Sequence, residues 1–131
     1  MTTVEKIENF LMEMDLSYKE LEDGIWIVED DNNHTGNIII KYDDPVVLFR
    51  VKVSTVPNSD KTEFFQKILE LNASDMIYGA YGLEGNNIVI INTLAAENLD
   101  FNEFQSTIES ISLSLMEHYE ILQQYFKKED A

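Results

Sequence analysis

The stretch Val46-Val47-Leu48-Phe49-Arg50-Val51-Lys52-Val53 decides the fold class, because every second residue from position 47 onward is apolar. Side chains alternate between the two faces of a β-strand, so positions 47, 49, 51 and 53 share one apolar face. Arg50 and Lys52 lie on the other face and mark it as partly exposed to solvent. The stretch therefore predicts a sheet strand that is buried on one side.

The residues before this strand predict an antiparallel meander. Residues 37–42 form a further strand, because turn-forming residues bound them on both sides: the polar segment 30–36 and the turn Asp43-Asp44-Pro45. Residues 18–21 and 25–29 flank Glu22-Asp23-Gly24, either as a tight hairpin or as one bent strand.

A second hairpin follows further along the chain. Its predicted strands span residues 77–83 and 87–94 around the turn Glu84-Gly85-Asn86. Gly79 and Gly82 weaken the first strand and suggest that another backbone or side chain approaches closely. Residues 88–91 are apolar on both faces, so this strand should be central or lie under an interface.

Three segments combine a capping-box spacing with apolar residues at steps of three and four. They begin after Thr2, Asp60 and Asp100 and span about residues 3–14, 61–71 and 101–126. The last helix would be ~39 Å long at 1.5 Å per residue, more than a domain of this size needs. Its excess would pack on a partner subunit or fray.

The order of elements predicts an α+β two-layer sandwich, formed by residues 1–131 as a single domain. An antiparallel sheet of about five strands carries helices on one face, in the order α-β-β-β-α-β-β-α.

The composition excludes several classes of function. Twenty-five acidic against nine basic residues give a formal charge of −16, which disfavours binding to nucleic acid or to anionic membranes. The chain has no cysteine, so disulfides and thiolate chemistry are excluded. Residues 1–14 do not resemble a signal peptide, and no apolar stretch approaches the ~20 residues of a membrane span. We therefore expect a cytoplasmic protein.

The sequence gives little support for a catalytic site or a metal site. Asp30, Asp31 and His34 do not have the spacing of a calcium loop and are better explained as a solvated loop. His118 is expected on the surface of the last helix. The glycines at 79, 82 and 85 are followed by a strand without the lysine and helix of a phosphate-binding loop. We expect no enzyme activity, no cofactor and no metal.

One sheet face is not explained by folding alone. Apolar residues are expected on the face opposite the helices, where they would be partly exposed: Trp26, Val28, Ile39, Val46 and Leu48, with a contribution from Val89 and Ile91 or their neighbours. Trp26, Val28, Ile39 and Leu48 are the residues predicted to contact the partner. Contiguous exposed apolar area often marks an interface, although scattered apolar residues are normal on any surface. Trp26 is the only tryptophan, and aromatic residues often anchor interfaces. We predict that this face binds a protein partner.

Three segments carry a family resemblance: Phe64–Asn72, Tyr78–Leu83 and Asn87–Leu94, followed by Leu99-Asp100. They resemble the second half of YbjN-like proteins, which share a fold group with the type III secretion chaperones of the Tir-chaperone, CesT-like kind. The resemblance implies a small acidic protein, usually dimeric, that binds other polypeptides and has no catalytic residues.

The leading hypothesis is therefore a chaperone-like homodimer that binds a secreted client. The alternative is a YbjN-like regulatory domain that binds one folded partner. Subunit contact is predicted at Phe65, Ile68, Tyr78, Tyr81 and Leu83.

Overall fold

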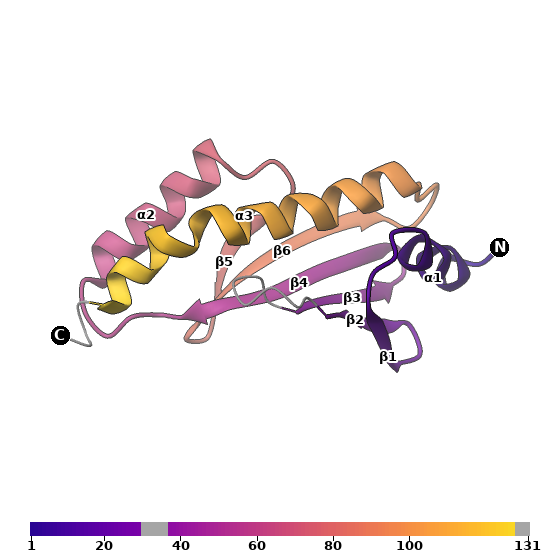
Figure 1. Ribbon diagram of the computed structural model, residues 1–131, viewed down its shortest axis with the longest axis horizontal. Helices are drawn as coiled ribbons and strands as arrows, with labels where there is room; N and C mark the ends of the chain where they lie inside the picture. Colours follow the sequence, from indigo (N-terminus) through magenta and orange to yellow (C-terminus); the bar gives the residue numbers. More distant parts are fainter. Residues whose placement is uncertain (30–36, 128–131) are drawn as a thin grey trace.

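The computed structural model describes residues 1–29 and 37–127 as a six-stranded antiparallel sheet with helices on one face (Figure 1). The strand order is β1-β2-β3-β4-β6-β5. The strands are β1 Tyr18–Glu22, β2 Ile25–Val28, β3 Ile38–Asp43, β4 Val46–Thr55, β5 Ala80–Glu84 and β6 Asn87–Ala95. The helices are α1 Thr3–Glu13, α2 Lys61–Ser74 and α3 Phe101–Lys127. The predicted α+β class and one-sided helix layer are confirmed.

The sheet contains one strand more than the predicted order. Residues 18–22 and 25–28 form a hairpin, with Tyr18 opposite Val28 and Glu22 opposite Ile25. Gly24 makes this turn possible because its φ of 81° lies in the left-handed region, which a residue without Cβ adopts at little cost. The hairpin is thus the correct one of the two alternatives.

Two of the three helices begin with the side-chain cap that the sequence predicts. The Thr2 side chain accepts a hydrogen bond from the Glu5 amide at 3.1 Å, and Asp100 accepts one from the Glu103 amide at 2.8 Å. Asp60 differs, since it has a left-handed φ of 55° and makes no side-chain cap bond. The capping box predicted there is wrong.

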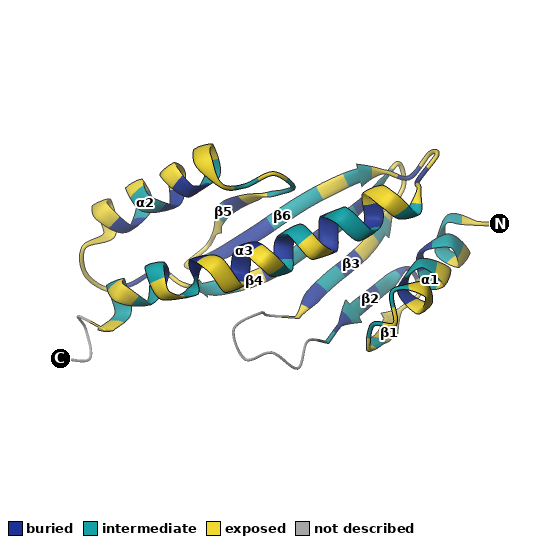
Figure 2. Cartoon of the chain, turned by 45° about the horizontal axis from the view of Figure 1, so that its top comes forward, coloured by how far each residue is buried: buried dark blue, intermediate teal, exposed yellow. Residues whose placement is uncertain are grey.

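The core lies between the helices and the face of the sheet that they cover. Trp26, Ile40 and Phe49 lie opposite one another on β2, β3 and β4 and are all fully buried. Phe49 packs edge-on against Phe104 of α3, with ring centroids 5.5 Å apart. The buried residues of α3 follow one stripe along the helix, which faces the sheet (Figure 2).

This arrangement overturns part of the expected partner face. Trp26 is 0% exposed and Val28 is also buried, because both point toward the helices. Pairing of Trp26 with Ile40, and of Ile40 with Phe49, places the tryptophan on the core side. A change of one residue in strand phase moves every side chain to the opposite face, which explains the error.

The second hairpin follows the expectation at its centre. β6 lies between β4 and β5, and residues 88–90 are buried, as their apolar character predicts. β5 begins only at Ala80 because Gly79 has a φ of 84°. A Cβ at Gly79 would lie 3.0 Å from the carbonyl oxygen of Ile91, which confirms the close approach predicted there; at Gly82 it would make only ordinary contact with Val89, at 3.8 Å.

Among the described residues, no helix has the length and apolar character that crossing a membrane requires.

Candidate functional site

The edge of the molecule formed by α2 and β5 contains an apolar hollow of about 240 Å³. β5 is the last strand of the sheet, so one of its sides has no neighbouring strand. Leu69 and Leu83 are 67% and 58% exposed beside the hollow. The residues that line it are Phe65, Ile68, Leu69, Asn72, Tyr81, Gly82, Leu83 and Ile88. Four of the five residues predicted for subunit contact are in this set; Tyr78 lies just before β5 and is half-buried.

Asn72 attaches β5 to the end of α2. Its side-chain oxygen accepts a hydrogen bond from the Tyr81 amide at 2.7 Å, and its amide nitrogen donates to the Tyr81 carbonyl at 3.2 Å. Asn72 therefore takes the place of a strand neighbour for the middle of β5. This contact joins the last turn of α2 to the segment Gly79–Gly82.

The Tyr81 side chain continues this connection into α3. Its hydroxyl lies 2.6 Å from Nδ1 of His118, and Nε2 of His118 lies 3.1 Å from a carboxylate oxygen of Asp75, which ends α2. His118 is only 1% exposed, so its predicted surface position is wrong. Position 118 falls on the stripe of three- and four-residue steps that runs from Phe104 to Leu122 and is buried in α3. This spacing could have predicted the burial of His118 from the sequence.

The surroundings of Tyr81 and Asp75 shift the pKa values of both groups. Burial, with a contribution from the Asp75 charge, raises the pKa of the Tyr81 hydroxyl well above its usual range, so it stays a donor. A hydrogen bond from Ser74 and one from His118 lower the pKa of the Asp75 carboxyl. A neutral His118 with its proton on Nε2 accepts from Tyr81 and donates to Asp75. The contacts join α2, β5 and α3 through two buried side chains, Tyr81 and His118, and one solvent-exposed carboxylate, Asp75.

The open face of the sheet is the second candidate site. Ile27, Ile39, Arg50 and Ile91 lie in one row across four strands, and Ile25, Lys41, Leu48 and Thr93 lie in the next. The isoleucines and Leu48 are half-buried although the helices lie on the other face (Figure 1). Ile39 and Leu48 are thus where the sequence places them. Ile25 and Ile27 of β2 take the positions expected for Trp26 and Val28, and Ile91 of β6 contributes to this face as expected.

Basic side chains accompany this apolar surface. Arg50 forms an ion pair with Glu84 of β5, and Lys19 pairs with Glu29 at 3.2 Å. Lys41 and Lys52 are exposed in the middle strands of the same face. This face combines apolar area with four basic side chains, two of which form ion pairs with glutamates.

The CesT_Tir_1 family model matches residues 1–128. The chain belongs to the CesT_Tir_1 family. The resemblance to YbjN-like proteins and type III secretion chaperones is confirmed by this match and by solved structures. No curated protein sequence matches the chain.

Solved structures share the fold of this CesT_Tir_1 chain at low sequence identity. A chain of the heterodimeric ExoU–SpcU complex of the Pseudomonas aeruginosa type III secretion system aligns with TM-score 0.69 and 13% identity, covering 91% of this chain and 96% of that one. The Yersinia pestis type III secretion chaperone SycH, in complex with a fragment of YscM2, aligns with TM-score 0.64 and 14% identity, covering 88% and 98%. YbjN from E. coli, a putative transcription regulator, aligns with TM-score 0.64 and 14% identity, covering 87% and 89%.

The described residues of this family member contain no cluster of three His, Cys, Asp or Glu side chains able to hold a metal ion. The loop with Asp30, Asp31 and His34 lies outside the described residues.

Proposed function

We infer that this chain is a cytoplasmic, non-enzymatic protein-binding module that acts as a homodimer and holds a partner polypeptide in the manner of a chaperone. The observation that carries this inference is the open sheet face, on which half-buried isoleucines and a leucine lie between basic side chains. Apolar area that no helix covers is typical of a surface that another polypeptide covers. Membership of the CesT_Tir_1 family and the fold shared with secretion chaperones support the same function.

The edge formed by α2 and β5 supports the homodimer. Asn72 already pairs with the outward backbone groups of Tyr81, so the surface open to another chain is the apolar hollow with the exposed leucines beside it. In a two-fold symmetric dimer the same patch meets itself, so each hollow can receive an exposed leucine, Leu69 or Leu83, from the partner. Phe65, Ile68 and Tyr81 would form the base of this contact, with Tyr78 at its margin.

Light scattering of a Leu83→Glu variant tests the dimer. The wild-type chain should have twice the mass of 15.2 kDa, and the variant should have the single mass because a buried carboxylate opposes association. Leu21→Glu is the matched control, since Leu21 is 53% exposed on the opposite edge strand, β1. A wild-type chain that stays monomeric at high micromolar concentration would contradict the homodimer.

Site-directed photo-crosslinking tests the partner face. Thr93 is exposed in the row of Leu48, so a photoreactive amino acid placed there should capture the partner in cells of the source organism. The same group at Lys61, on α2, is the control, and it should capture little. If the photoreactive group at position 93 forms no adduct and the group at position 61 does, the partner binds on the helical side instead.

Limited proteolysis of the captured complex separates a chaperone from a regulator. A client held in an extended conformation should leave a short protected fragment, whereas a folded partner should persist as an intact domain. The second result would favour the regulatory alternative.

A further inference from the structure

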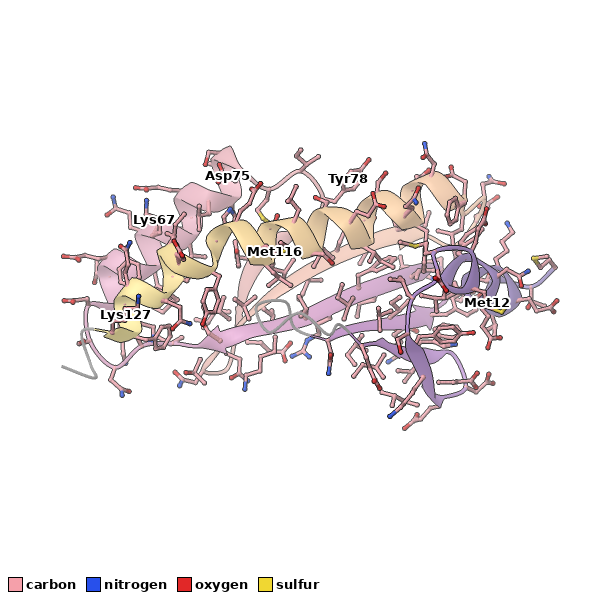
Figure 3. The ribbon with its side chains drawn as sticks, viewed as in Figure 1. Met12, Lys67, Asp75, Tyr78, Met116 and Lys127 are labelled. Carbon is pink, nitrogen blue, oxygen red and sulfur yellow. The ribbon has the colours of Figure 1, made fainter. Side chains whose placement is uncertain are left out.

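A second apolar groove lies on the helical side of the molecule, between α3 and the end of α1. Its volume is about 370 Å³, within the range of pockets that bind ligands. One wall is formed by Met14 and Leu16, and the other is a single stripe of α3. The stripe consists of Gln105, Ile108, Glu109, Ser112, Leu113 and Met116. Figure 3 shows Met116 on this helix and Met12 on α1 (Figure 3).

The groove exposes large apolar side chains that the fold does not use. Leu113 and Met116 are 55% and 51% exposed, while Ile108 is buried at the base. Met14 and Met116 give the groove two flexible thioether side chains, which adapt to differently shaped apolar partners.

The charge around the groove is negative. Glu109 lines it, and Glu13, Asp15 and Glu117 are exposed next to its lining residues in the sequence. The basic residues of the two helices do not offset this charge: Lys6 donates to the Leu99 carbonyl at 3.5 Å, and Lys127 lies about three turns beyond Met116. An acidic rim around an apolar floor selects a partner with basic and apolar residues.

We propose that this groove binds a basic amphipathic helix of another protein. The apolar stripe of that helix packs on Ile108, Leu113 and Met116, and its lysines or arginines pair with Glu109 and Glu117. The walls are a helix stripe and a turn, which offer no strand edge, so a helix with satisfied backbone groups fits better than an extended segment. A second copy of this chain is a poor occupant, because none of its described helices has a basic stripe that could pair with the acidic rim: their basic residues are Lys6, Lys61, Lys67 and Lys127, and Lys67 already pairs with Glu70.

This inference is independent of the proposed function, since the groove uses α1 and α3 and neither the open sheet face nor the α2–β5 edge. The methionines make the two regions distinguishable. Met14 and Met116 line the groove, whereas Met76 follows α2 on the side of β5.

Methyl NMR of the full chain labelled at its methionine methyl groups provides the test. The probe is an 18-residue helical peptide with leucines on one face and lysines on the other, and its control is the same composition with the stripe scrambled. The signals of Met14 and Met116 should shift saturably with the amphipathic peptide, and that of Met76 should stay in place. The scrambled peptide should bind at least tenfold more weakly.

Two variants locate the binding site. Leu113→Gln should weaken peptide binding about tenfold, while Leu21→Gln, at an equally exposed leucine on β1, should leave it unchanged. Equal binding of both peptides would show diffuse charge attraction and overturn the proposal. A shift of Met76 without Met14 and Met116 would also overturn it. A change in the mass of the peptide-free protein with Leu113→Gln would show that a second copy occupies the groove, again against the proposal.

Discussion

The connection from Tyr81 through His118 to Asp75 predicts a specific loss of stability when it is broken. Tyr81→Phe removes only the hydroxyl that lies 2.6 Å from Nδ1 of His118. Because His118 is 1% exposed, water cannot replace this donor, and the nitrogen stays buried without a partner. Leaving a buried polar group unpaired costs about 1–3 kcal/mol of unfolding free energy.

His118→Leu breaks the same hydrogen bond from the other side. The Tyr81 hydroxyl is then unpaired, so His118→Leu by itself should also lower the free energy of unfolding by about 1–3 kcal/mol. Asp75 adds little to this loss, since its side chain is 42% exposed and water can replace the imidazole. The double variant leaves neither partner unpaired, so it should lose less than the sum of the single losses by about 1–2 kcal/mol.

Urea denaturation at one fixed protein concentration measures these differences, because association of the kind proposed above would make the stability depend on concentration. With a slope of roughly 1–3 kcal/mol per molar urea, the single variants should shift the midpoint by about 1 M. Tyr78→Phe is the matched control, as Tyr78 is half-buried three residues earlier, and it should change stability by no more than about 0.5 kcal/mol. Strictly additive losses in the double variant would refute the coupling.

Three further predictions concern Trp26, Gly79 and Asp75. The fluorescence of Trp26 should peak at short wavelength and should resist quenching by acrylamide; a red-shifted, quenchable signal would contradict the burial of this side chain. Trp26→Ala should lower the free energy of unfolding, measured by urea denaturation, by about 3–5 kcal/mol. Gly79→Ala should lower the melting temperature through a loss of about 1–3 kcal/mol, because φ is 84° and the new Cβ would lie 3.0 Å from a carbonyl oxygen; unchanged melting would show that the backbone relaxes there. Hydrogen bonds from Ser74 and His118 lower the pKa of Asp75 in the folded chain. The ionised carboxylate therefore stabilises the fold above its ordinary pKa of about 4. This stabilisation is lost as the pH falls through the pKa that Asp75 has in the folded chain. Asp75→Asn should therefore make the free energy of unfolding fall less steeply as the pH drops below ~4. If the variant loses stability with falling pH as steeply as the wild-type chain, Asp75 is not the source of this pH dependence.

Local sequence patterns determined the elements of this protein. Alternation along residues 46–53, the caps at Thr2 and Asp100, and the glycine at 79 are properties of a few consecutive residues, so they could be predicted correctly. The apolar run at 88–91 likewise indicated a strand buried on both faces. The acidic composition and the family resemblance also needed no coordinates.

Tertiary structure decided which face each side chain occupies. Trp26 and Ile27 are neighbours in the sequence, yet pairing with β3 buries the first and places the second on the open face. His118 is buried because α3 brings it against Tyr81, a residue of another element. Strand register and helix crossing depend on contacts between distant segments, so periodicity shows that a stripe exists but not what covers it. For the same reason the sequence indicated an apolar open sheet face without giving all of its residues, and the groove on α3 became visible only in the tertiary structure.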